Sequence, residues 1–180
     1  MGSDTITEAG TAPAVEQVTE GPRTTKKTII LFSGDFDKVM AAMIIANGAA
    51  AMGDDVTIFA TFWGLNILRK VEKVPTEGKS TLQKMFGGMM PKGTNKTALT
   101  KMNMLGMGTS MMRKATKQAG GMSLEELFES AREMGVKFVA CTLSMDILGF
   151  KPEELIDDIE FEGVAAYLAH ADEANVNLFI

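Results

Sequence analysis

The sequence predicts an α/β protein, a three-layer α/β/α sandwich around a mostly parallel five-stranded sheet. Five short apolar and β-branched runs have the length of strands, and stretches with helix signals separate them. Continuous apolar runs of this kind are typical of parallel strands that are buried on both faces. The connections between the runs are long enough for the right-handed crossovers that parallel strands require.

The first half of the chain predicts two strands and the helix between them. The first strand is expected at 28–32 and ends at Ser33-Gly34-Asp35. Residues 37–52 are apolar nearly all round, which predicts a largely buried helix that Gly53 ends. A second strand is expected at 56–61, and a short helix follows it from Trp63.

The second half predicts the remaining three strands. Ser123 has the position of an N-cap before the acidic first turn of a helix that ends at Gly135. Pro152 is favourable at the first position of another helical turn. The other expected elements are strands at 136–141, 159–161 and 176–180 and helices at 144–148 and 163–172.

A length of 180 residues suits one domain, and no self-similarity at a fixed period indicates a repeat protein. Residues 1–26 have few large apolar residues and no period, so we expect a flexible leader before a single domain at 27–180. The N-terminus lacks the features of a secretory signal, and no apolar stretch approaches the ~20 residues that a spanning helix needs.

Charge and methionine are concentrated in one segment. From Lys79 to Lys117 there are eight Lys and Arg residues, no Asp or Glu, and eight of the 15 Met residues, although the whole chain has net charge -5. We interpret about 80–116 as a basic, Met-rich insertion in the domain, with an apolar helix face that begins at Leu82.

Three interpretations of this Met-rich insertion remain open, and a fourth is not expected. A flap or oligomer surface fits the adaptability of Met side chains, and an acidic partner or an anionic membrane surface fits basic residues beside apolar ones. Copper(I) could bind the thioethers of Met102, Met104 and Met107. Nucleic acid is not expected as a partner, because the basic residues are not interleaved with aromatic ones and the whole chain is acidic.

Cys141 is the only cysteine, so the chain holds no internal disulfide and no Cys-built zinc site. This usage fits the reducing cytoplasm, where we expect the protein. Cys141 stands where the third strand passes into a helix, whose first amides would stabilise a nucleophilic thiolate. The alternative is a small buried hydrophobe, which is a common role for free cysteine.

Other candidate residues follow from the rule that sites in parallel sheets form at the carboxyl ends of the strands. Ser33 or Asp35 is also expected to cap the first helix. The Gly pattern after the first strand lacks both the dinucleotide-binding fingerprint and the phosphate-binding loop. The sole histidine, His170, is expected away from this edge. We predict neither a metal nor an organic cofactor. The expected site-lining residues are Ser33, Gly34, Asp35, Trp63, Gly64, Thr142 and Ser144.

Several segments resemble the DsrE/DsrF/DsrH-like sulfur-relay family, in the branch that carries a long Met-rich insertion. These segments are 28–35, 59–65, 102–109, 139–146 and 163–168, and the resemblance extends over 26–180.

The resemblance implies a five-stranded parallel sandwich that assembles into homo- or hetero-oligomers, and we expect a homo-oligomer here. It also implies that Cys141 carries sulfur as a persulfide, as a sulfur carrier or sulfurtransferase, with rhodanese-like or TusA-like proteins as partners. The alternative function is a non-enzymatic module that binds a ligand, a partner or a membrane surface through the Met-rich insertion.

Overall fold

The computed structural model describes residues 25–72, 74 and 77–180. Residues 1–24 of the expected leader lie outside the described residues, and Lys26 already begins the first strand.

The sheet has five strands in the order β4-β3-β2-β1-β5. Every pair of neighbouring strands is parallel, which confirms the predicted fold class. In this order β1 is flanked by β2 and β5, although the residues that pair β1 with β5 are about 149 positions apart. The strands are β1 (Lys26–Leu31), β2 (Asp55–Ala60), β3 (Lys137–Cys141), β4 (Glu160–Glu162) and β5 (Val176–Phe179).

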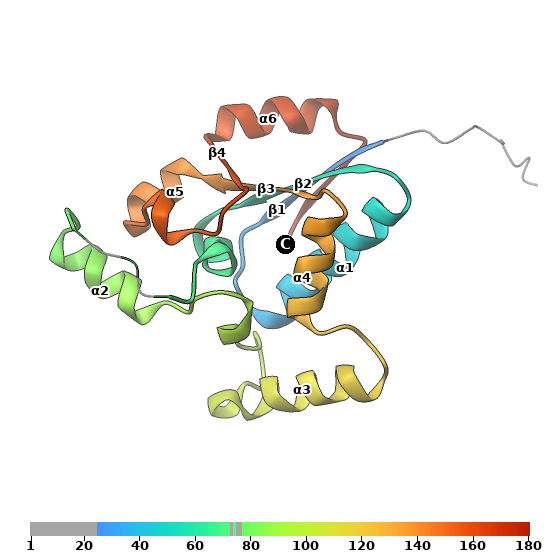
Figure 1. The fold of residues 1–180 in the computed structure, drawn as a ribbon, viewed down its shortest axis with the longest axis horizontal. Helices are drawn as coiled ribbons and strands as arrows, with labels where there is room; N and C mark the ends of the chain where they lie inside the picture. Colours follow the sequence, from blue (N-terminus) through green and yellow to red (C-terminus); the bar gives the residue numbers. More distant parts are fainter. Residues whose placement is uncertain (1–24, 73, 75–76) are drawn as a thin grey trace, which may run out of the picture.

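The helices cover the two faces of the sheet unequally (Figure 1). Helices α1 (Phe36–Ala51) and α4 (Leu124–Glu133) pack against each other on one face, over the main hydrophobic core. Helix α6 (Val164–Glu173) covers the other face, where a smaller core joins Phe59, Val139, Cys141 and Tyr167. Within the described part of the chain, α6 is therefore the helix that separates this smaller core from solvent.

Helix α1 is less buried than its composition predicts. Its buried positions include Ala42, Ala46 and Ala49, whose small side chains let the helix lie close to the sheet. Ile44 and Ile45 are nevertheless exposed, because they lie on the opposite side of the helix. The expectation of a largely buried helix is thus wrong for one apolar face.

Capping of the helices agrees with the sequence at α4 and differs at α1. Ser123 and Glu126 form a reciprocal capping box at the start of α4. Asp35 holds the N-cap position of α1, but neither it nor Ser33 caps the helix through its side chain. The expectation of a side-chain cap there is wrong, because the Asp35 carboxylate is engaged by Lys38 and Thr100.

The Met-rich insertion adds α2 (Thr81–Met89) and α3 (Met107–Gln118), which project away from the layered body (Figure 1). Short 3-10 segments connect them at Thr94–Lys96 and Met104–Gly106. No residue of α2 is buried, and Thr109 is the buried residue of α3. None of the helices in the described part of the chain is long and apolar enough to cross a membrane.

Two buried cations attach the insertion to the body. Lys79 forms an ion pair with Glu154, and both side chains are almost fully buried, at 3% and 8% exposed. Arg69 lies over the Phe150 ring at 4.5 Å and donates to the carbonyl oxygens of Gly87, Met90 and Pro91. Arg69 thereby satisfies carbonyls at the C-terminal end of α2, which is a favourable place for a cation.

Candidate functional site

The loops that follow β1 and β2 pack backbone against backbone at the carboxyl edge of the sheet. The Gly64 N–H donates to the Phe32 carbonyl at 2.9 Å. A Cβ atom on Gly64 would lie 2.0 Å from the Leu31 oxygen, and one on Gly34 would lie 2.6 Å from the Trp63 oxygen. Glycine is therefore required at both positions, and the predicted segments 33–35 and 63–64 are brought together.

Asp35 is held by polar partners from two segments. Its carboxylate accepts hydrogen bonds from the hydroxyls of Ser33 and Thr100, both at 3.0 Å, and from Lys38. Burial alone would raise the pKa of Asp35, but the hydrogen bonds from Lys38, Ser33 and Thr100 outweigh it and lower that pKa. Asp35 is thus an ionised anchor for the loop before α3.

Thr142 and Ser144 tie the segment after β3 to neighbouring strands. These residues belong to α5 (Thr142–Leu148), which begins directly after Cys141. The buried Ser144 hydroxyl lies 2.7 Å from that of Thr61 at the end of β2, and the Thr142 hydroxyl donates to the Glu162 carbonyl at 3.3 Å. Every predicted site-lining residue therefore lies in a segment at this edge of the sheet.

Cys141 ends β3 and occupies the N-cap position of α5, as the sequence predicts. Its thiol does not accept a hydrogen bond from the α5 backbone. The side chain is only 2% exposed and belongs to the small core with Phe59, Val139 and Tyr167. The thiol therefore lies on the α6 side of the sheet, beneath that helix.

Glu162 is the neighbour of Cys141 that sequence reasoning missed. The two residues are register partners in the parallel pair β3–β4, so their side chains lie on the same face of the sheet. One Glu162 carboxylate oxygen is buried without a hydrogen-bond partner among the described residues, and the other lies 3.3 Å from His170 Nε2 on α6. His170 is therefore connected to the surroundings of Cys141 through Glu162, rather than separate from them.

The sequence does contain a signal that places Glu162 at the sheet edge near Cys141. The sequence predicts the fourth strand at 159–161, one residue short of the observed end at Glu162. Extending that strand by one position places a carboxylate at the same sheet edge as the end of the third strand.

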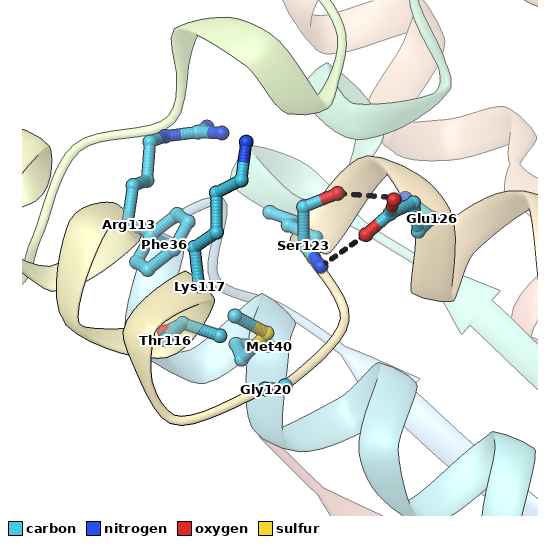
Figure 2. A pocket seen from close by; sticks show the side chains of 10 residues that line it. Phe36, Met40, Arg113, Thr116, Lys117, Gly120, Ser123 and Glu126 are labelled. Carbon is cyan, nitrogen blue, oxygen red and sulfur yellow. Dashed lines mark hydrogen bonds between the residues drawn. The ribbon is translucent and has the colours of Figure 1, made fainter.

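A separate cavity of about 390 Å³ lies between α1, α3 and α4 (Figure 2). In it the Arg113 guanidinium stacks over the Phe36 ring at 4.8 Å and also pairs with Glu125 at 2.7 Å. The capping box of Ser123 and Glu126 closes one side. None of its lining residues comes from β3, α5 or β4, so this cavity is distinct from the surroundings of Cys141.

The arrangement around Cys141 offers one nucleophile and one carboxylate in a largely apolar setting. Nowhere in the described part of the chain do three His, Cys, Asp or Glu side chains group as a metal site. The chemistry that these residues can perform on their own is attack by the Cys141 thiolate on an electrophilic sulfur or carbon atom.

Known proteins resemble the chain along nearly all of its length. A model of the DsrE/DsrF/DrsH-like family matches residues 23–179. The uncharacterized protein YrkE of Bacillus subtilis is 57% identical over 158 residues, which cover 88% of this chain and 98% of YrkE. The sulfur carrier protein DsrE2 of Allochromatium vinosum is 35% identical over 162 residues, which cover 86% of this chain and 98% of that protein.

Two solved structures share the fold at low sequence identity. The ychN protein from E. coli matches with a TM-score of 0.51 and 12% identity, covering 87% of this chain and 100% of that one. The MTH1491 protein of unknown function from Methanobacterium thermoautotrophicum matches with a TM-score of 0.50 and 12% identity, covering 87% and 99%. Because the family model matches and YrkE and DsrE2 are 57% and 35% identical, the chain belongs to the DsrE/DsrF/DrsH-like family.

Proposed function

We propose that this protein carries sulfane sulfur as a persulfide on Cys141 and passes it to a partner thiol. The family and the relative named as a sulfur carrier suggest a role in sulfur relay. The observation that carries the finer proposal is the place of the only thiol, at the carboxyl end of an interior parallel strand, where sites of this fold class form.

The transfer is an exchange between thiolates and persulfides. The Cys141 thiolate attacks the outer sulfur of a donor persulfide, the donor S–S bond breaks, and the donor leaves as a thiolate. An acceptor thiolate then attacks the outer sulfur on Cys141, whose S–S bond breaks to regenerate the Cys141 thiolate. Sulfur moves without a change in the total number of electrons, so neither step needs a metal or an organic cofactor.

Burial of Cys141 imposes a condition on this chemistry. The thiol is 2% exposed, so a donor or acceptor reaches it only when its cover moves. That cover is α6, whose Tyr167 packs in the same small core. We propose that α6 shifts during transfer and uncovers the thiol, next to the polar pair of Glu162, the register partner of Cys141, and His170, half-exposed on α6.

The partners follow from the same proposal. Rhodanese-like and TusA-like sulfur-transfer proteins are suitable donors and acceptors, in the cytoplasm where thiols stay reduced. A homo-oligomer is supported by exposed apolar side chains on and beside α6, which are unfavourable in contact with water. These side chains are Phe161, Val164, Leu168 and Phe179.

Sulfur loading tests this function directly. The purified chain is incubated with a rhodanese and thiosulfate, and intact mass spectrometry is expected to show an increase of about 32 Da, one sulfur atom. The increase should disappear in Cys141→Ser and persist in Ser110→Ala, a matched change at an exposed position of α3. An unmodified wild-type chain, or an adduct that survives Cys141→Ser, contradicts the proposal.

A second candidate function is peripheral contact with an anionic membrane through the Met-rich insertion. The observation that favours it is a set of lysines that pair with no acidic residue in the described ranges and lie among exposed Met and Leu side chains. These lysines are Lys84, Lys92, Lys96, Lys101, Lys114 and Lys117.

Co-sedimentation with vesicles tests this contact. Vesicles with anionic lipids should bind the protein, vesicles of zwitterionic lipids should not, and added salt should weaken the binding. Removal of residues 80–116 should abolish the binding and leave sulfur loading on Cys141 intact. Equal binding to both vesicle types, or none to either, contradicts this second function.

A further inference from the structure

A groove of about 710 Å³ lies beside α3. Its most frequent lining residue is methionine, from the loop before α3 and from the helix itself. Leu99 and Ala115 add further apolar surface, and the charged side chains of Asp37, Lys38 and Lys101 also line the groove. The methionines are Met102, Met104, Met107, Met111 and Met112.

A network of hydrogen bonds builds the loop that presents the first two methionines. The Leu99 N–H donates to the Thr109 hydroxyl at 2.9 Å, and that hydroxyl donates to the Asn103 side-chain oxygen at 2.8 Å. The Asn103 carbonyl accepts from the N–H groups of Gly106 and Gly108 at 2.8 and 3.1 Å. The loop is therefore fixed to the first turn of α3.

Glycine makes the close approach of this loop to α3 feasible. A Cβ atom on Gly108 would lie 1.9 Å from the Met102 carbonyl oxygen. Any other residue at 108 would push Met102 away from the helix. This places the Met102 backbone directly against the turn that carries Met107 and Met111.

The backbone of the loop before α3 is strained, and burial of its side chains does not offset that strain. Met102, Met104 and Leu105 have φ values of 59°, 41° and 59°, in the left-handed region that costs side-chain-bearing residues about 1–2 kcal/mol each. Met102 and Met104 are nevertheless 80% and 66% exposed, so core packing does not offset this cost. Strain held in place at an exposed position is a feature of binding sites.

We propose that this groove binds a soft monovalent cation of the Cu(I) class through methionine thioethers. Thioether sulfur is a neutral, soft ligand that favours Cu(I) and Ag(I), whereas Mg²⁺, Ca²⁺ and Zn²⁺ favour oxygen, nitrogen or thiolate ligands. The one carboxylate that lines the groove, Asp37, already accepts hydrogen bonds from Thr100, and the soft ligands that the groove offers are thioethers. The inference does not rest on sulfur transfer at Cys141.

The chemistry of thioethers gives this site a distinctive property. Thiolate and imidazole ligands must lose a proton before they bind a metal, which makes their affinity dependent on pH. Thioethers carry no such proton. The affinity of the groove for Cu(I) should therefore stay constant between about pH 6 and about pH 8.

The test is an anaerobic titration of Cys141→Ser with Cu(I) against a chromophoric Cu(I) chelator, so that the thiol does not contribute. We expect one tightly bound ion, with binding weakened at least about tenfold by Met107→Leu combined with Met111→Leu. Leucine keeps the size and apolar character of methionine, so the fold and any purely apolar contact are preserved. Circular dichroism and urea denaturation verify that each variant folds.

Met85→Leu combined with Met89→Leu is the matched control, because both residues are exposed on α2 and neither lines the groove. This control should bind Cu(I) as the parent does. The proposal is overturned if the folded Cys141→Ser chain fails to compete with the chelator, if groove and control variants lose binding equally, or if affinity rises with pH as expected for thiolate or imidazole ligands.

Discussion

Replacing Tyr167 by Ala should expose Cys141 to reagents without unfolding the rest of the sheet. The Tyr167 ring lies 4.8 Å from that of Phe59, and its hydroxyl lies 3.3 Å from the Thr28 hydroxyl. Cys141 belongs to the same small core, which α6 covers. Removal of this ring therefore weakens the closed position of α6 in particular.

The magnitude follows from the packing that is lost. Truncation of a buried aromatic side chain to Ala costs about 3–5 kcal/mol. If all of this loss falls on the closed position of α6, the open population rises about 10²- to 10⁴-fold, since each ~1.4 kcal/mol is a factor of ten. Tyr167→Phe removes only the hydrogen bond to Thr28, worth about 0.5–1.5 kcal/mol, and should raise the open population about two- to tenfold.

The assay is the rate of Cys141 alkylation by iodoacetamide in the folded protein, followed by intact mass. The rate should be far below that of the urea-unfolded chain for the wild type and should rise in the order wild type, Tyr167→Phe, Tyr167→Ala. Phe128→Ala is the matched control, because the Phe128 ring forms a comparable pair with Phe138 at 4.9 Å in the core on the other face.

Two outcomes would refute this reasoning. If wild-type Cys141 reacts as fast as in the unfolded chain, the thiol is not covered. If Phe128→Ala speeds alkylation as much as Tyr167→Ala, Cys141 reacts through global unfolding and α6 does not open on its own.

Three further predictions concern stability. Glu154→Gln leaves the Lys79 ammonium buried without a counter-charge and should lower the free energy of unfolding by about 3–5 kcal/mol, measured by urea denaturation. Lys79→Met combined with Glu154→Leu should recover most of that free energy. Equal stability of Glu154→Gln and the wild type would contradict this prediction. Burial tends to raise the pKa of Glu154, but hydrogen bonds from Lys79 and the Lys151 N–H lower it below its ordinary value of 4.5, so its contribution is complete above about pH 4.5 and is lost as pH falls through the lowered pKa. The stability difference between wild type and Glu154→Gln, measured by urea denaturation across pH 3–7, should accordingly shrink in acid, and a difference that grows there would be the wrong sign. Gly64→Ala forces a Cβ atom to 2.0 Å from the Leu31 oxygen and should lower the free energy of unfolding by about 1–3 kcal/mol or more. A Cβ atom added at Gly48 in α1 meets no neighbouring atom within 4 Å, so Gly48→Ala should raise that free energy by about 0.5–1 kcal/mol. Thermal denaturation compares the two variants.

The sequence predicts the framework well because the central strands are determined by local patterns. The strands at 28–32, 56–61 and 136–141 lie within two residues of β1, β2 and β3, since apolar and β-branched residues dominate each run. Cys141 is placed correctly at the end of β3 for the same reason. Parallel pairing then brings the predicted loops to a single edge.

The remaining features depend on contacts between distant segments. Helix α3 is missed because Gly106 and Gly108 suggest an interruption, whereas Gly106 precedes the helix and Gly108 lies inside it against Met102. The partners of Asp35 are missed because Thr100 is 65 residues away in the sequence. The burial of Cys141 follows from α6 crossing to the opposite face on its way from β4 to β5, and no local pattern encodes that crossing.

The position of β1 between β2 and β5 also sets the order of events during synthesis. β1 emerges from the ribosome first and gains β2 early, but its other edge has no partner until residues 176–179 are made. During that interval the nascent chain presents an open, apolar strand edge, which is a site of aggregation. Closing a pair across about 149 residues is also slow, so this protein is expected to depend on chaperones while it is being translated.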